Sequence, residues 1–70
     1  MLKRDRVRKK LVDLGFSYKT TTDRTYLYKR GTDAIFLPKK SLIDPDWVRA
    51  QLRDYMSSAD IETFIREAKT

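Results

Sequence analysis

The sequence predicts an α+β fold, a two-layer sandwich in which helices cover one face of a three-stranded antiparallel sheet. Apolar residues recur at helical spacing near both ends of the 70-residue chain, alternate with polar residues in its middle, and are separated by turn-forming residues. The expected order of elements is α-β-β-β-α-α, in a single domain covering residues 1–70. Helices on either side of an antiparallel meander fold back onto one face of the sheet, which leaves the other face open.

The first helix is expected over residues 2–14. Val7, Leu11 and Leu14 recur at i, i+4 and i+7, and Gly15 follows as a left-handed C-terminal cap. Basic residues occupy the remaining faces: Lys3, Arg4, Arg6, Arg8, Lys9 and Lys10. Lys9 and Lys10 also complement the helix dipole near its C-terminus, so they have a structural interpretation beside a nucleic-acid-binding one.

The stretch 20–40 is expected to form a basic, aromatic β-hairpin, preceded by a strand over 16–20. Gly31 can supply the positive φ that a two-residue type II′ turn needs at its first central position. Counting outward from that turn pairs Arg30 with Asp33, Tyr28 with Ile35, Leu27 with Phe36 and Tyr26 with Leu37. Pro38 ends the last strand, because it cannot donate to a ladder. We expect a ligand to lie on the open sheet face, among aromatic rings flanked by lysines.

Two helices are expected to end the chain. Asp44 can cap the first of them, Pro45 fits its first helical position, and Val48, Leu52 and Tyr55 form its inward stripe. The segment 57–60 fits a capping box, and apolar residues then continue at helical spacing: Ile61, Phe64, Ile65 and Ala68.

The composition excludes several classes of protein. Without cysteine the chain has no disulfide framework or thiolate zinc site, and without histidine it has no Ser-His-Asp triad or two-histidine nuclease site. Its apolar runs are far shorter than the ~20 residues needed to span a bilayer, and the N-terminus lacks a signal-peptide core. We expect a cytoplasmic protein with no membrane contact, metal site or cofactor, since Asp44 and Asp46 are explained by helix capping.

The net charge of +6 is unevenly distributed. Residues 1–40 carry twelve Lys or Arg and four Asp, a net charge of +8, whereas residues 41–70 carry four Lys or Arg and six Asp or Glu, a net charge of −2. A basic pole of this kind suits a polyanion, and RNA is the expected partner. Tyr18, Tyr26 and Tyr28 interleave with cations and could stack on unpaired bases. Alternatively, Tyr18 and Tyr28 fill the core with their hydroxyls at its edge.

The layout of motifs along nearly the whole chain resembles the HicA-like (YcfA-like) toxins. A basic first helix ends in LxxLGF over 11–16, a strand ends in the aromatic Tyr28, and a short hairpin leads to an apolar-x-apolar-Pro strand over 35–38. A basic link and a helix carrying VRxxL over 48–52 follow. The resemblance implies a double-stranded-RNA-binding-domain-like fold. It also implies the activity of an mRNA interferase, an endoribonuclease and thus a hydrolase, in a toxin–antitoxin system with a HicB-like antitoxin as partner.

The family's Gly-Ser-x-His signature falls on residues 23–26, which places Tyr26 at the position of the catalytic histidine. A second histidine of the family falls near Lys40. Both positions depart from the family pattern, and this weakens the inference of nuclease activity.

Cleavage by the RNA 2′-OH requires a base, an acid and charge to stabilise the phosphorane. The candidate catalytic residues are Tyr26 and Lys40, although a phenol is a poor base at neutral pH. The candidate nucleic-acid-binding residues are Lys9, Lys10, Arg24, Tyr26, Tyr28, Lys29, Arg30, Lys39 and Lys40. Three alternatives to cleavage remain: RNA binding alone, DNA binding, or protein interaction through an edge strand or the acidic C-terminal helices.

Overall fold

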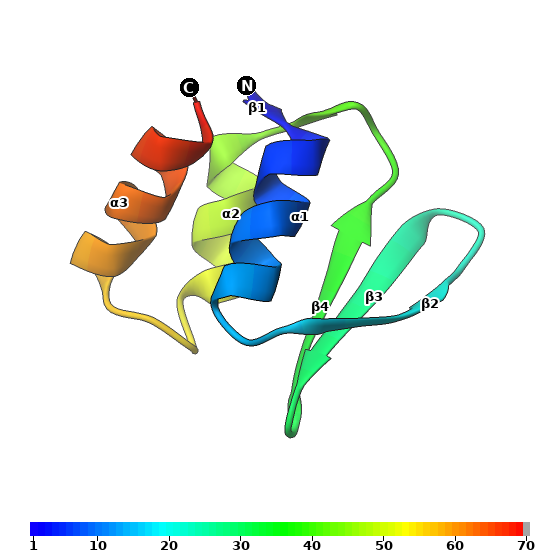
Figure 1. Ribbon diagram of the computed structural model, residues 1–70. Coiled ribbons are helices and arrows are strands. Elements are labelled where there is room, and N and C mark those ends of the chain that lie inside the picture. The colour runs from blue at the N-terminus through cyan, green and yellow to red at the C-terminus, as the bar shows by residue number, and fades with distance from the viewer. Residues whose placement is uncertain (70) are drawn as a thin grey trace.

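One helix, a three-stranded meander and two further helices follow one another along residues 1–69, the part of the chain that the computed structural model describes (Figure 1). The predicted α+β class and the predicted order of the main elements are confirmed. A short additional pair was not predicted: β1 (Leu2–Lys3) lies antiparallel to β5 (Leu42–Ile43). This pair joins the N-terminus to the segment that follows the sheet.

The first helix, α1 (Arg4–Asp13), begins two residues later than predicted, because Leu2 and Lys3 pair as a strand. Its C-terminus is capped as predicted. Gly15 has a φ of 94°, and its N–H donates to the Val12 carbonyl at 2.9 Å, while the N–H of Phe16 donates to the Leu11 carbonyl at 3.0 Å. These two bonds form a Schellman motif, which satisfies carbonyls that the helix leaves free.

The sheet consists of β2 (Ser17–Thr21), β3 (Thr25–Arg30) and β4 (Asp33–Pro38), in that spatial order. All four residue pairs predicted between β3 and β4 are confirmed. Gly31 has a φ of 59°, and no other residue of the β3–β4 turn has a positive φ. This is the type II′ pattern, since a type I′ turn needs positive φ at both central residues. The first strand begins at Ser17 rather than at residue 16 and contains a bulge between Tyr18 and Thr20.

The last two helices, α2 (Pro45–Leu52) and α3 (Ser58–Ala68), begin where capping residues were predicted. The Asp44 carboxylate accepts from the backbone N–H of Asp46 at 2.8 Å, and the Ser57 hydroxyl accepts from that of Asp60 at 3.2 Å. Tyr55 lies beyond the end of α2, and its hydroxyl donates to the carbonyl of Ala34 in β4 at 3.2 Å. That bond joins the helical layer to the sheet.

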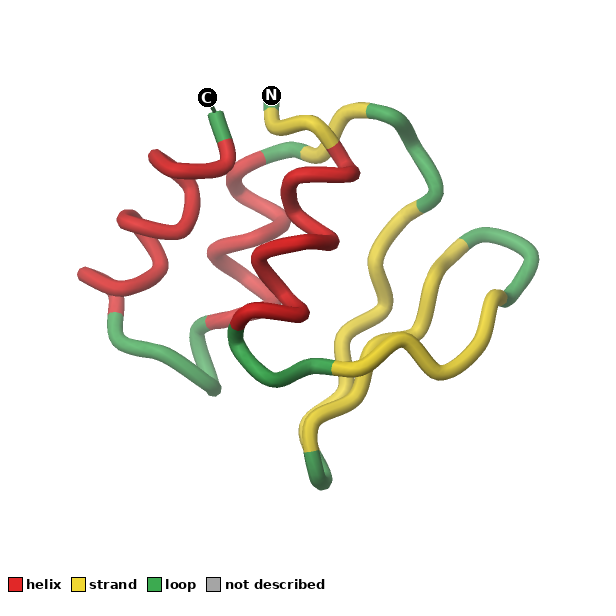
Figure 2. The backbone as a smooth tube through the Cα atoms, viewed as in Figure 1, coloured by secondary structure: helices red, strands yellow, loops and turns green. Residues whose placement is uncertain are grey.

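The helices lie together on one side of the sheet, and the β3–β4 turn projects away from them (Figures 1 and 2). Buried hydrophobic side chains from both layers form one core: Leu2, Val7, Leu11, Phe16, Tyr28, Ile35, Leu37, Ile43, Val48, Leu52, Ile61, Phe64, Ile65 and Ala68. No helix within residues 1–69 combines the length and apolar character required to cross a membrane.

Candidate nucleic-acid interface

The tyrosines of the sheet point toward the helices, not toward the open face. Tyr18 lies opposite Tyr28, which lies opposite Ile35, and Tyr26 lies opposite Leu37. Directly opposed residues share a face, and Ile35 and Leu37 are fully buried against the helices. These three tyrosines therefore do not lie on the open face, where a ligand was expected among aromatic rings.

The open face carries a different aromatic side chain. Phe36, directly opposite Leu27, is 50% exposed, and the exposed Lys29 lies opposite Ala34 on the same face. The predicted site residue Lys29 is thus separated by the sheet from the tyrosines with which it was grouped.

Arg8 of α1 connects the three tyrosine rings. Its guanidinium carbon lies 4.4 Å from the ring centroid of Tyr26 and 6.0 Å from those of Tyr18 and Tyr28. Its Nε donates to the Tyr28 hydroxyl at 2.7 Å, and this bond raises the pKa of Arg8 above its ordinary value. All three distances lie within the range of cation–π attraction. Arg8 therefore holds a permanent positive charge against an aromatic surface.

Two further cations surround the half-buried Tyr26. The Arg4 guanidinium carbon and the Lys39 Nζ each lie 5.8 Å from its ring centroid, and Arg4 Nη1 donates to the Lys39 backbone carbonyl at 2.8 Å. Asp5 forms an ion pair with Arg4 at 3.4 Å. We refer to Arg4, Arg8, Tyr18, Tyr26, Tyr28 and Lys39 as the arginine–tyrosine cluster.

The three rings of the cluster differ in accessibility. Tyr18 is 48% exposed, and its hydroxyl is hydrogen-bonded to that of Thr21. Tyr28 is only 2% exposed, so its ring fills the core and cannot stack on a base. The predicted binding role of the Tyr28 ring is wrong, and its alternative, a core ring with the hydroxyl at the edge, is confirmed. Tyr18 is the ring that solvent reaches most freely.

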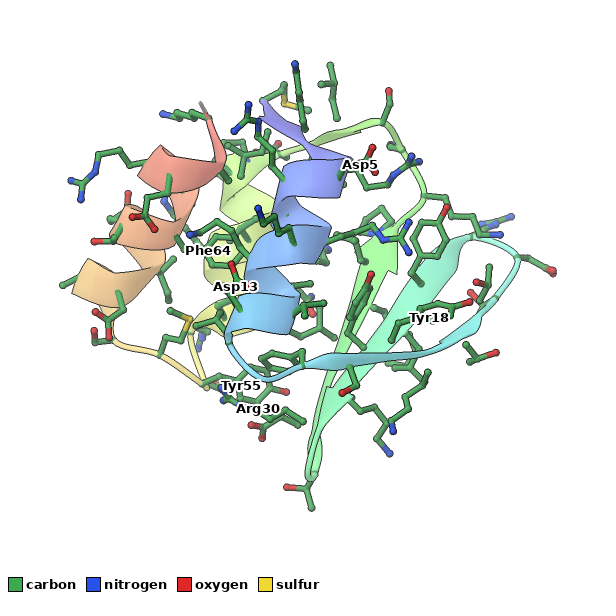
Figure 3. The ribbon with its side chains drawn as sticks, in the orientation of Figure 1. Asp5, Asp13, Tyr18, Arg30, Tyr55 and Phe64 are labelled. Carbon is green, nitrogen blue, oxygen red and sulfur yellow. The ribbon has the colours of Figure 1, made fainter. Side chains whose placement is uncertain are left out.

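A basic groove adjoins the cluster at the N-terminal end of α1. It is lined by Lys3, Arg4, Asp5, Arg6, Lys9, Ser41 and Leu42, so Arg4 belongs to both the groove and the cluster. The predicted binding residue Lys9 lies here. Figure 3 shows Asp5 on the same side of α1 as Tyr18, whereas Phe64 lies between α1 and α3.

Comparison of the chain with protein-family models, curated proteins and solved structures found no match. The function must therefore be inferred from the chain's own residues and their geometry.

Two cations that were predicted to bind nucleic acid contact other parts of the protein. Arg30 donates to Asp33 at 3.1 Å and to the Leu14 carbonyl at 3.1 Å, and its guanidinium carbon lies 4.6 Å from the Phe16 ring centroid. Lys10 Nζ lies 2.6 Å from Glu67 Oε1, on the side of α1 that faces α3. Both cations join elements of the fold and lie outside the cluster, and their role in nucleic-acid binding stays a prediction.

The remaining predicted residues to place are Arg24, Lys39 and Lys40. Arg24 is exposed, and its carbonyl accepts from the backbone N–H of Lys39 at 3.1 Å. Lys40 lines a separate hollow with Pro38 and Trp47, so the structure places Lys39, rather than Lys40, against Tyr26. The catalytic role predicted for Tyr26 and Lys40 stays a prediction.

Arg4 and Arg8 were not selected from the sequence as site residues. They are four residues apart, so they lie on one flank of α1, beside the stripe formed by Val7 and Leu11. This spacing could have identified them from the sequence. A long cationic side chain next to a core-facing stripe can contact the strands that pack against the same helix.

Proposed function

We propose that this chain is an RNA-binding domain and that the arginine–tyrosine cluster, with the adjoining groove, is its binding surface. The observation that carries the proposal is the gathering of three cations around the ring of Tyr26, next to the half-exposed ring of Tyr18. Like charges placed this close repel one another, and a bound polyanion would relieve that repulsion.

The pairing of rings with cations favours RNA with unpaired bases. Such bases stack on aromatic side chains while arginine and lysine neutralise the neighbouring phosphates. Tyr18 offers the stacking surface, and Arg4 continues from the cluster into the groove, where Lys3, Arg6 and Lys9 can follow the phosphate backbone. The resemblance to HicA-like toxins supports the same ligand.

Endoribonuclease activity is a second candidate, favoured by the surroundings of Tyr26. This residue takes the position of the family's histidine, and Arg4, Arg8 and Lys39 could stabilise a phosphorane there. In that case the chain would be the toxin of a toxin–antitoxin pair with a HicB-like partner. Purified protein should then cleave RNA, and Tyr26→Phe should abolish cleavage. Cleavage that survives the substitution would remove Tyr26 from the mechanism.

The binding proposal is tested by fluorescence anisotropy with a labelled single-stranded RNA of twelve nucleotides. The logarithm of the affinity should fall with the logarithm of the salt concentration, with a slope of about −0.7 for each phosphate contact. Tyr18→Ala should weaken binding about tenfold, since stacking of one base contributes ~1–3 kcal/mol, and Tyr18→Phe should retain most of the affinity. Arg8→Met should weaken binding as well.

The matched control is Arg53→Met. Arg53 lies at the end of α2 with a side chain that is 76% exposed, and its single ion pair within residues 1–69 is a weak one with Asp54 at 4.0 Å, so the substitution removes the same charge outside the cluster. Equal losses for Arg8→Met and Arg53→Met would show that net charge alone attracts RNA. An affinity that does not respond to salt would refute the proposed mode of binding.

A further inference from the structure

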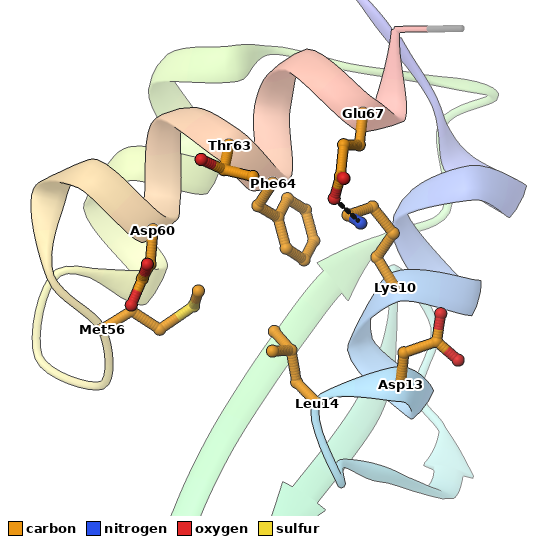
Figure 4. A pocket seen from close by; sticks show the side chains of 8 residues that line it. All are labelled: Lys10, Asp13, Leu14, Met56, Asp60, Thr63, Phe64 and Glu67. Carbon is orange, nitrogen blue, oxygen red and sulfur yellow. Dashed lines mark hydrogen bonds and ion pairs between the residues drawn. The ribbon is translucent and has the colours of Figure 1, made fainter.

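A hollow of about 240 Å³ lies between α1 and α3 (Figure 4). Its apolar floor is formed by Leu14, Met56 and Phe64. Lys10 and Asp13, the residues of α1 that line it, are about 200° and about 140° around the helix from Arg8, because successive residues turn by about 100°. The hollow shares no residue with the arginine–tyrosine cluster, although a smaller hollow that includes Lys10 and Asp13 adjoins both it and the basic groove.

Lys10 shows how a cationic side chain fits this place. Its Nζ lies 2.6 Å from Glu67 Oε1 and 5.5 Å from the ring centroid of Phe64. The Lys10 side chain is 23% exposed, and its ammonium group meets a carboxylate at the rim. Long cationic side chains are suited to such amphipathic sites, since their stems bury and their charged heads remain near water.

Two more carboxylates flank the same floor. Asp13 extends from α1 and Asp60 from α3, on either side of Leu14 and Phe64 in Figure 4. Within residues 1–69, neither side chain forms a hydrogen bond or an ion pair. With Lys10 and Glu67 paired, the rim carries a net charge of −2 in a chain whose net charge is +6. The lining itself is therefore acidic and favours a cation, while Arg6 and Lys9 lie in the adjoining hollow that also contains Asp13.

We propose that this hollow receives one arginine or lysine side chain from a basic segment of a protein partner. Its volume is below the ~300–1,000 Å³ typical of small-molecule pockets and suits a single side chain. The stem of the inserted residue would lie on Leu14 and Met56, and its charged head would reach Asp13 or Asp60. The domain then has two faces, a basic one for RNA and an acid-rimmed one for a basic protein segment.

The test is an NMR titration of the isotopically labelled domain with the synthetic peptide acetyl-GRLRG-amide. Saturable amide shifts should be confined to the lining residues, namely Leu14, Met56, Thr63 and Phe64. A second peptide replaces each arginine by citrulline, which has the same shape and no charge. It should bind at least threefold more weakly, because it cannot form ion pairs with Asp13 or Asp60.

Variants separate this site from general attraction to acidic residues. The double variant Asp13→Asn with Asp60→Asn should weaken the arginine peptide about threefold to tenfold, as expected for two exposed charge pairs. Asp54→Asn removes a charge from an exposed carboxylate outside the hollow and should leave binding unchanged. Equal effects of the double variant and Asp54→Asn, or shifts spread over the whole acidic surface, would overturn the proposal. Shifts that depend on protein concentration without peptide would place a second copy in the hollow and would also overturn it.

Discussion

The contact between Arg8 and Tyr26 makes a quantitative prediction that does not depend on the ligand. Arg8→Met keeps an unbranched stem and removes the guanidinium, which lies 4.4 Å from the Tyr26 ring centroid. Tyr26→Leu keeps an apolar side chain and removes the ring. Combining the two substitutions in a double-mutant cycle isolates their mutual interaction, because the bond from Arg8 to Tyr28 is lost in every variant that lacks Arg8 and cancels.

The expected magnitudes follow from the geometry. Arg8→Met alone should lower the free energy of unfolding by about 1–2 kcal/mol, because it removes a partly exposed hydrogen bond worth ~1 kcal/mol and a cation–π contact worth ~0.5–1 kcal/mol. The melting temperature should fall by roughly 4–8 °C for each kcal/mol in a domain of this size. The coupling energy between Arg8 and Tyr26 should be about 0.5–1 kcal/mol.

Urea denaturation of the wild type, the two single variants and the double variant measures this coupling. A parallel cycle with Arg53→Met in place of Arg8→Met should be additive, because Arg53 lies at the end of α2, where it pairs with Asp54 and not with Tyr26. Additivity in both cycles, within about 0.3 kcal/mol, would mean that Arg8 and Tyr26 do not interact measurably in solution. The contact between Arg8 and Tyr26, on which the RNA-binding proposal rests, would then not contribute to the stability of the folded domain.

Two further predictions concern the turn and the pair between α1 and α3. Gly31→Ala should lower the free energy of unfolding by about 1–2 kcal/mol in urea denaturation. The cost comes from the φ of 59° alone, because an added Cβ would meet no atom within 4 Å; Thr32→Ala, at the neighbouring turn position, should have little effect. The hydrogen bond from Lys10 lowers the pKa of Glu67, so Lys10→Met should raise that pKa toward its ordinary value in an NMR titration. The stabilisation from the pair should be present above the ordinary pKa of Glu67 and be lost as the pH falls through the lowered value. A stability difference between the variant and the wild type that does not shrink in acid would contradict this, because the contact of Lys10 with Phe64 does not depend on pH.

The features predicted correctly are those set by local chemistry. Gly15 and Gly31 have the positive φ that their positions require, and Asp44 and Ser57 accept bonds from the helix starts that follow them. In each case the partner atoms lie within a few residues, so a short stretch of sequence contains the whole interaction. The register between β3 and β4 followed from the turn for the same reason.

The contacts that were not predicted join residues far apart in the chain. Arg30 meets the carbonyl of Leu14, 16 residues away, and Lys10 meets Glu67, 57 residues away. A cation in a basic run looks the same in the sequence whether it faces solvent or ties two elements together. Only the packing of α1 against β2 and α3 decides which cations remain free for a ligand.

The choice of sheet face explains why the candidate surface lies at the edge of the core. On the helix-facing side, the β3–β4 pair carries four large apolar or aromatic side chains, Tyr26, Tyr28, Ile35 and Leu37, and on the other side it carries two, Leu27 and Phe36. Burial of a large side chain stabilises by ~1.5–3 kcal/mol, so turning the four inward is favoured by several kcal/mol. The buried Tyr28 hydroxyl then needs a partner, and Arg8 supplies it. That bond brings a fixed positive charge against Tyr26 and Tyr18, so the demands of core packing themselves create the charged aromatic surface that we assign to RNA.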